Sequence, residues 1–323
     1  MSDQLEHRGP DGAGTRLLVL PDCTIGLAHR RLSIIDLTET GTQPMAFDGV
    51  LVTFNGEIYN YKEIRHDLQV LGHTFVGGSD TEVILHAYKQ WGINCIERFI
   101  GMFSFVMYDE KQGKLFCVRD RAGVKPFYYY RTNDLFLFAS ELKAFHRHPG
   151  FDRELDHSAV AAFMQFGNIP GTHCVFKNCN KLSPGHYGVF DLKSRTLELH
   201  KYWDVYDYYN KPKLGIDWEE AKTETENLLV SAASYRMIAD VPVGVFLSGG
   251  YDSACLTALL QKNTSEKLKT YTIAVSDLGL NEAPFAKEVA ELLGTDHHEL
   301  ECSSQEALTL IDQLPFYYDE PFA

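Results

Sequence analysis

Val241-Pro-Val-Gly-Val-Phe-Leu247-Ser248-Gly249-Gly250-Tyr251-Asp252-Ser253 is the stretch that decides the fold of the second half of the chain. Its first seven residues are an apolar run typical of a buried strand, and residues 252–262 have the spacing of a helix. Between them, the two glycines let the backbone turn tightly and point its N–H groups at an anion. The positive N-terminus of the next helix faces the same place, at the carboxyl end of a strand. The string therefore predicts a phosphate site.

Strands and helices alternate around this string. We expect helices at residues 218–238, 282–293 and 305–314, and strands at residues 269–275 and 297–302. This alternation predicts a parallel sheet with right-handed crossovers, that is, an α/β domain at residues 217–323. Residues 201–216 are polar and aromatic without a clear period, so they predict a linker.

Residues 1–200 have a different pattern, with short apolar runs and few helices. An apolar strand at 50–56 ends in Asn-Gly, and helical spacing covers 61–71 and 81–91. Turn residues join the run 101–108 to 114–119, and the run 125–130 to 135–138, which predicts two hairpins. An α+β domain, with an antiparallel sheet layered against helices, is expected here.

Composition narrows the function. The chain has 323 residues, of which 45% are hydrophobic, enough for about two domains. A net charge of -14 disfavours nucleic acid or an anionic membrane as partner. The seven cysteines are irregularly spaced, which argues against a disulfide framework or zinc site and favours a reducing, cytoplasmic location. No apolar run is long enough to span a bilayer, and the first residues lack a signal-peptide pattern.

Four strings in the first half carry the residues that an amino-acid amide would need. They are His7-Arg8-Gly9-Pro10-Asp11-Gly12, Arg31-Leu32-Ser33-Ile34-Ile35-Asp36, Asn55-Gly56-Glu57-Ile58-Tyr59-Asn60 and Ser79-Asp80-Thr81-Glu82. Arg31 can pair with a carboxylate, and Asp80 and Glu57 can accept an ammonium group. The Asn55 side-chain amide and the Gly56 N–H can stabilise an oxyanion. Two simpler interpretations stay open at this point, a hairpin turn at Asn55-Gly56 and a surface salt bridge for Arg31.

The strings resemble two known protein modules. The four strings are similar to the class II glutamine amidotransferase domain, an N-terminal-nucleophile hydrolase with αββα layers. The string Ser248–Ser253 lacks the Lys-Ser/Thr ending of a Walker loop and resembles the pyrophosphate loop of the N-type ATP pyrophosphatases, whose fold is adenine nucleotide α-hydrolase-like. In this order, and over nearly the whole chain, they look like the asparagine synthetase (glutamine-hydrolysing) family.

The resemblance implies a reaction. Aspartate is adenylated by ATP with Mg²⁺ to β-aspartyl-AMP, and ammonia from glutamine arrives through an internal tunnel, giving asparagine, AMP and pyrophosphate. A homodimer is compatible with it. The residues implied for glutamine are Arg31, Leu32, Ile35, Asn55, Gly56, Glu57 and Asp80, with Asn55 and Gly56 as the catalytic oxyanion hole. Those implied for ATP are Phe246, Leu247, Ser248, Gly249, Gly250, Tyr251, Asp252, Ser253 and Ile273, with Asp252 as metal ligand and Phe246, Leu247 and Ile273 around adenine.

The chain departs from the family pattern at its start. The family nucleophile is an N-terminal cysteine, whereas this chain begins with Met1-Ser2. Ser2 lies only five residues before His7, so we expect it to be a linker residue, and Cys23 is internal. We therefore expect no glutaminase activity from the chain as printed.

The end of the chain also departs from the pattern, because Asp319-Glu320-Pro321-Phe322-Ala323 lies inside the second domain of the family. We expect that both ends of a longer protein are missing. Asp319 and Glu320 are open to two interpretations, part of an acceptor site or a solvated acidic turn.

Two other functions remain open. Relatives in polysaccharide or antibiotic clusters use another carboxylate acceptor, including those that are β-lactam synthetase-like. Tyr251, where the family more often has Leu, and the missing cysteine favour that alternative slightly. The second alternative is a non-catalytic remnant that binds glutamine or nucleotide.

Overall fold

The computed structural model describes residues 1–275 and 281–322. They form two compact units: Met1–Lys211 together with the residues from Tyr318 onward, called here the first unit, and Pro212–Tyr317, the second unit. Across the described residues, helices long and apolar enough for a membrane crossing are absent. The domain limits expected from the sequence stay a prediction.

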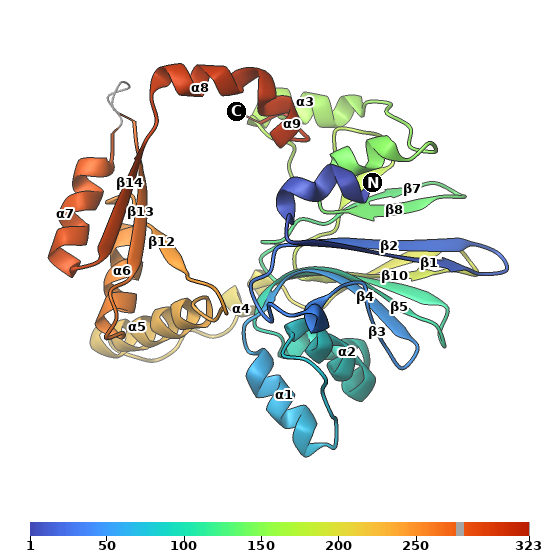
Figure 1. Ribbon diagram of the computed structural model, residues 1–323, viewed down its shortest axis with the longest axis horizontal. Helices are drawn as coiled ribbons and strands as arrows, with labels where there is room; N and C mark the ends of the chain where they lie inside the picture. The colour runs from blue at the N-terminus through green and yellow to red at the C-terminus, as the bar shows by residue number, and fades with distance from the viewer. Residues whose placement is uncertain (276–280, 323) are drawn as a thin grey trace. The chain divides into compact units, whose positions relative to one another are not determined.

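The first unit contains a six-stranded antiparallel sheet covered by helices on one face (Figure 1). Helices α1 (Tyr61–Val70) and α2 (Asp80–Trp91) pack together, and α2 packs against the sheet. The strand order is β11 (Thr196–Lys201), β10 (His186–Asp191), β6 (Lys114–Arg119), β5 (Gly101–Asp109), β4 (Val50–Ile58) and β3 (Met45–Phe47).

A second layer of strands covers the other face of this sheet (Figure 1). It consists of the hairpin β1 (Gly12–Val19) and β2 (Thr24–Arg31) and the three-stranded sheet β8 (Phe136–Ala139), β7 (Tyr128–Arg131) and β9 (Cys179–Lys181). The outer helical layer includes α3 (His157–Phe166) and the short 3-10 helices η1 (Ser2–Arg8) and η4 (Leu142–Arg147). The expected αββα layering is confirmed, and β4 and β5 are buried on both faces because they lie at its centre.

The predicted helices and hairpins of this half are present, with four differences. The hairpin β1–β2 and helix α3 were not expected. Strand β7 begins at Tyr128, later than predicted, because Pro126 has no N–H for a ladder and its carbonyl accepts the Ser104 hydroxyl instead. Asn55-Gly56 is not a hairpin turn, since both residues lie inside β4, opposite Ser104 and Phe103 of β5.

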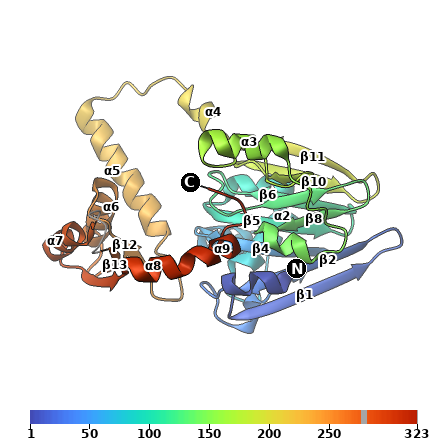
Figure 2. The same cartoon turned by 90° about the horizontal axis from the view of Figure 1, so that it is seen from above.

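The second unit is built on the parallel sheet β12 (Gly244–Phe246), β13 (Lys269–Ala274) and β14 (Asp296–Glu301), which confirms the α/β expectation. Helix α7 (Ala283–Leu293) packs against β13 and β14, and α5 (Trp218–Tyr235) packs against α6 (Tyr251–Lys262) (Figure 2). Helices α8 (Ser304–Leu310) and α9 (Leu314–Tyr317) flank the 3-10 turn η5 (Ile311–Gln313).

Two details of this half differ from expectation. Strand β12 is shorter than the predicted strand at 241–247, and Pro242, which has no N–H, lies in the part that does not pair. The stretch expected to be a linker contains the short helix α4 (Val205–Tyr209), which Asp204 caps by accepting the Tyr206 N–H.

The residues that end the described chain pack in the first unit. The Asp319 carboxylate lies 3.2 Å from Lys143 Nζ, and the Glu320 carboxylate lies 2.7 Å from Lys181 Nζ. Glu320 also accepts the Val175 N–H at 2.8 Å. The side chains of Asp319 and Glu320 are only 9% and 12% exposed, so the alternative of a solvated acidic turn is wrong.

Candidate functional site

A cavity of about 680 Å³ lies in the first unit. The seven residues that the sequence assigned to glutamine all line it: Arg31, Leu32, Ile35, Asn55, Gly56, Glu57 and Asp80. They come from the end of β2, the loop after it, the end of β4 and the start of α2. Apolar side chains, including Phe105, Phe127 and Leu137, line much of the rest of the cavity. The fold thus brings three distant strings of sequence to one concave surface, and Arg8 of the fourth string also lines it.

Arg31 is the last residue of β2, and its guanidinium is held by backbone carbonyls. Nη1 donates to the Thr38 carbonyl at 2.8 Å, and Nη2 donates to the Asp36 carbonyl. The interpretation of Arg31 as a surface salt bridge is therefore not what the described residues show. Because a guanidinium has five N–H donors, this arrangement leaves donors that can bind a carboxylate in the cavity.

Two carboxylates form an acidic wall of the same cavity. Asp80, the first residue of α2, accepts the Ile58 N–H at 2.9 Å and is buried. Burial, together with the nearby charge of Glu57, raises the pKa of Asp80 to about 7. Burial also raises the pKa of Glu57, and the positive charge of Lys125 opposes that change. An incoming ammonium group would favour the ionised form of both carboxylates.

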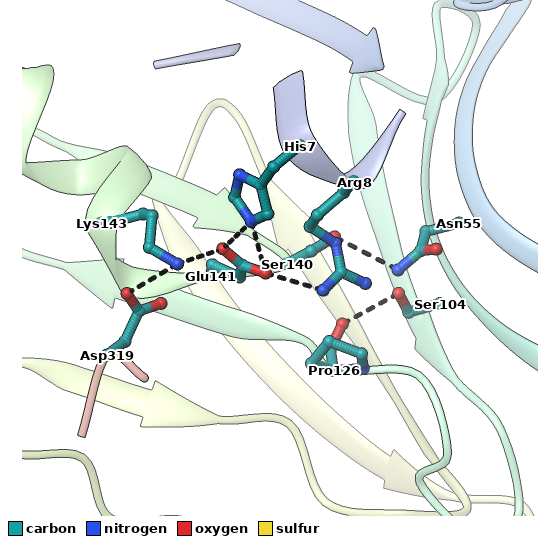
Figure 3. Close-up of polar contacts among 9 residues, drawn as sticks. All are labelled: His7, Arg8, Asn55, Ser104, Pro126, Ser140, Glu141, Lys143 and Asp319. Atoms are coloured by element: carbon teal, nitrogen blue, oxygen red, sulfur yellow. Dashed lines mark hydrogen bonds and ion pairs between the residues drawn. The ribbon is translucent and has the colours of Figure 1, made fainter. Parts of the chain in front are cut away.

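Asn55 and Gly56 place amide groups on the wall that β4 provides. The Asn55 side chain donates from Nδ2 to the Ser140 hydroxyl at 3.3 Å, as Figure 3 shows. Gly56 has φ +151°, and a Cβ at this position would meet the Met102 carbonyl oxygen of β5. Only glycine fits this close approach of the β4 and β5 backbones.

A second charged cluster adjoins this wall (Figure 3). Glu141 binds His7 at 3.1 Å, Arg8 at 2.7 Å and Lys143, which also pairs with Asp319. Burial opposes ionisation of Glu141, but the hydrogen bonds from Lys143 and Arg8 outweigh it and lower its pKa. Arg8, which lines the cavity, is thereby anchored through its Nη1.

The structure adds cavity residues that the sequence did not single out, among them His29, Lys125 and Ser140. Burial is the main reason that the pKa of His29 falls to about 4, so its imidazole is neutral at pH 7. Lys125 stands in Gly123-Val-Lys-Pro126, directly before an apolar run. A cation at the start of such a run is the sequence signal that could have marked it as a site residue. Ser2 was expected to be a linker residue, but it lies in η1 and lines the cavity, so that expectation is wrong.

The string Ser248–Ser253 forms the end of the tight loop between β12 and α6 and the first turn of α6 in the second unit. Ser248 Oγ lies 2.9 Å from Ser253 Oγ and accepts the Gly250 N–H at 3.3 Å. Gly249 has φ +77°, and Gly250 is the N-cap of α6, which has no side-chain cap. The first N–H groups of α6 are thus available to an anion, as expected for a phosphate loop.

The residues expected around adenine are spread over β12, the loop after it and β13. Leu247 is buried, and its N–H and carbonyl bond to Tyr271 and Thr272 of β13. Phe246 is 82% exposed and Ile273 is 55% exposed. Tyr251 and Asp252 are exposed at the start of α6. An adenine contact by this set stays a prediction.

Family comparisons agree with this layout. Residues 1–203 match the sequence model of the glutamine amidotransferase domain, and residues 224–323 match that of asparagine synthase.

Individual relatives match over nearly the whole chain. A Methanocaldococcus jannaschii protein, provisionally named asparagine synthetase (glutamine-hydrolyzing) 2, is 37% identical over 100% of this chain and 65% of its own length. Asparagine synthetase (glutamine-hydrolyzing) 3 of Bacillus subtilis is 32% identical over 99% of this chain and 54% of its own. Amidase chry2 of Gibberella zeae is also 32% identical, over 99% and 49%. The chain thus spans about half to two thirds of the length of these relatives.

Among solved structures, a glutamine phosphoribosylpyrophosphate amidotransferase from B. subtilis aligns with a TM-score of 0.45 and 16% identity, over 92% of this chain and 61% of that one. The two family matches follow each other along the chain in the order of its two halves. The chain belongs to the asparagine synthetase (glutamine-hydrolysing) family, with a glutamine amidotransferase domain followed by an asparagine synthase domain.

Proposed function

We propose that the protein makes asparagine from aspartate with ammonia taken from glutamine, through a β-aspartyl-AMP intermediate and with release of AMP and pyrophosphate. The observation that carries this proposal is that Arg31, Glu57 and Asp80 line the same cavity. Glutamine is an amino acid amide, so its free carboxylate and ammonium groups match these charges. Asn55 and Gly56 then face its side-chain amide as the oxyanion hole.

The second unit supports the ATP half of the proposal. The asparagine synthetase family uses ATP, and the loop Ser248–Ser253 provides N–H and hydroxyl donors for pyrophosphate. Asp252 is the one metal ligand that we assign. Within residues 1–275 and 281–322, no group of three metal-binding side chains comes together. Mg²⁺ is commonly held by one or two carboxylates with phosphate oxygens and water, and Asp252 would supply such a carboxylate. Bound there, the ion would neutralise charge on the departing pyrophosphate.

Two carboxylate substrates are candidates for the acceptor of ammonia. Aspartate is the acceptor in the reaction that gives the family its name, whereas one relative of similar identity is named an amidase. A different carboxylate acceptor, as in a β-lactam synthetase-like enzyme, is therefore the second candidate function. A homodimer and a cytoplasmic location remain predictions.

The first test is glutamine binding by the 323-residue chain. We expect calorimetry to show binding, and we expect Arg31→Ala to weaken it by about tenfold or more, because a charged hydrogen bond is lost. Arg16→Ala, in β1, is the matched control, since Arg16 does not line the cavity. No binding by the unaltered chain, or equal affinity of both variants, would contradict the glutamine site.

Ammonia release is measured on the same samples. We expect none above the Arg31→Ala background, because none of the cysteines in the described residues lines the cavity. If ammonia does appear, Ser2→Ala decides whether the Ser2 hydroxyl supplies the nucleophile. Pyrophosphate release that depends on aspartate separates asparagine synthesis from use of another acceptor and from a non-catalytic remnant.

A further inference from the structure

The Asp36 carboxylate accepts hydrogen bonds from two segments of the chain, residues 38–40 and Gly78. Asp36 ends the string Arg31–Asp36, has φ +55°, and is only 7% exposed. Its carboxylate accepts hydrogen bonds from the Thr38 N–H at 3.1 Å, the Thr38 hydroxyl at 2.6 Å, the Thr40 hydroxyl at 2.6 Å and the Gly78 N–H at 3.0 Å. Burial alone would raise the pKa of Asp36, but these bonds outweigh it and lower the pKa to about 2.

Three of these hydrogen bonds shape the turn that holds Arg31. They come from Thr38 and Thr40, which follow Asp36 directly. The carbonyls of Asp36 and Thr38 are the acceptors for the Arg31 guanidinium. A Cβ at Gly41 would strike that guanidinium, so the turn encloses it closely. The direction of the Arg31 side chain therefore depends on a turn that the Asp36 carboxylate stabilises.

The fourth hydrogen bond reaches a different segment of the chain. Gly78 is 42 residues away and stands two residues before Asp80, the buried acid of the cavity. Asp80 is itself fixed by the Ile58 N–H. One carboxylate thus links the turn around the cation to the segment that carries the acid. In an α-amino acid the two groups to be bound sit on the same carbon atom, so the relative position of Arg31 and Asp80 determines whether both can bind.

We propose that Asp36 is a positioning residue that sets Arg31 and Asp80 at the separation needed to bind the carboxylate and ammonium groups of one ligand. This inference rests on the proposed glutamine site. It goes further by assigning the selection of a complete α-amino acid to a residue that does not touch the ligand. The sequence marks Asp36 only as the end of a string.

The test compares three ligands. Glutamine uses both ends of the site, glutaramate lacks the ammonium group, and 4-aminobutanamide lacks the carboxylate. In Asp36→Asn an amide NH2 replaces one acceptor oxygen and faces the Thr38 or Gly78 donors. We expect glutamine to bind about tenfold more weakly, and each one-ended analogue to change by less than about threefold, as measured by NMR titration. A purely structural defect would weaken all three ligands alike.

Asp48→Asn is the matched control. Asp48 also has a positive φ, +44°, but its side chain is 56% exposed and pairs with Lys89 away from the cavity. We expect no change for any ligand. If Asp36→Asn does not fold, Thr40→Val removes a single bond to Asp36 and should give the same pattern at a smaller size.

The positioning role of Asp36 and the glutamine site fail in different experiments. Failure of the unaltered chain to bind glutamine overturns both. Glutamine binding that is unchanged in Asp36→Asn, or that weakens by the same factor as both analogues, overturns only the positioning role. In the supporting case, the amide resonance of Gly78 also moves in Asp36→Asn and stays in place in Asp48→Asn, because the hydrogen bond from Gly78 is then altered.

Discussion

Replacing Gly249 by alanine is expected to lower the free energy of unfolding of the second unit by about 3 kcal/mol. Gly249 has φ +77°, and a Cβ built there would lie 2.7 Å from Phe285 Cβ and 2.8 Å from the Ala286 backbone nitrogen. Both atoms belong to α7 and cannot rotate away, so the helix or the loop must shift. The left-handed backbone adds a strain of about 1 kcal/mol to this overpacking.

Gly294→Ala separates the two contributions. Gly294 has φ +71° in the same unit, but a Cβ there would meet nothing within 4 Å. We expect a loss of about 1 kcal/mol, from backbone strain alone. Hydrogen exchange of the α6 and α7 amides, followed by mass spectrometry, measures both variants. Equal losses would show that the contact between the phosphate loop and α7 is not tight. We also expect that Mg-ATP does not protect the α6 amides of Gly249→Ala from hydrogen exchange.

Asp80 is expected to make the first unit less stable as the pH rises. Its pKa rises from the ordinary 3.8 of an aspartate to about 7 in the fold, so between these values the folded state holds a proton that the unfolded state releases. The contribution of protonated Asp80 to the free energy of unfolding is therefore fully present below about pH 4. It is lost as the pH rises through 7, by at most roughly 4 kcal/mol. In Asp80→Asn this loss should vanish, because an amide has no charge to bury.

The measurement is the difference in unfolding free energy between the unaltered chain and Asp80→Asn, from urea unfolding between pH 4 and 8. In this difference, the contributions of groups that titrate alike in both proteins cancel. Glu57 is an exception, because its pKa is also raised and will change when the neighbouring charge of Asp80 is removed. A difference that stays flat across this range would show that Asp80 is already ionised at low pH.

Glutamine should reverse this effect. Its ammonium group favours the ionised carboxylate, so binding near pH 6 should release about one proton. Calorimetry in two buffers of different ionisation enthalpy detects that proton. Tighter binding at low pH than at pH 8 would contradict the placement of the ammonium group at Asp80.

Much of the architecture could be predicted because it depends on local patterns. Apolar runs joined by turn residues predicted β5–β6 and β7–β8, and helical spacing predicted α1, α2 and α5. The hairpin β1–β2 was missed because β1 is mostly exposed and mixes glycine, Thr15 and Arg16 with its apolar residues. Asn55-Gly56 was open to interpretation as a turn because its dipeptide is typical of one. Its actual place in β4 depends on pairing with a strand nearly fifty residues away.

The cavity shows the same division. Arg31, Glu57 and Asp80 could be assigned because their charges match the carboxylate and ammonium groups of an amino acid. Asp36 could not, because its role lies in a hydrogen bond to Gly78 that only the folded chain creates. Ser140 was missed for the same reason, since its contact with Asn55 joins residues 85 positions apart.

The carboxylates of Asp319 and Glu320 bear on how this protein can be dissected. The asparagine synthase match at residues 224–323 includes them, yet they pack against Lys143 and Lys181 in the first unit. A recombinant fragment cut after Lys211 would therefore lack Glu320, which pairs with Lys181, and Asp319, one of the two carboxylates that pair with Lys143. Losing such a partner from a largely buried ion pair commonly destabilises a protein by several kcal/mol. We therefore expect an isolated fragment of residues 1–211 to be less stable than the same residues are in the whole chain.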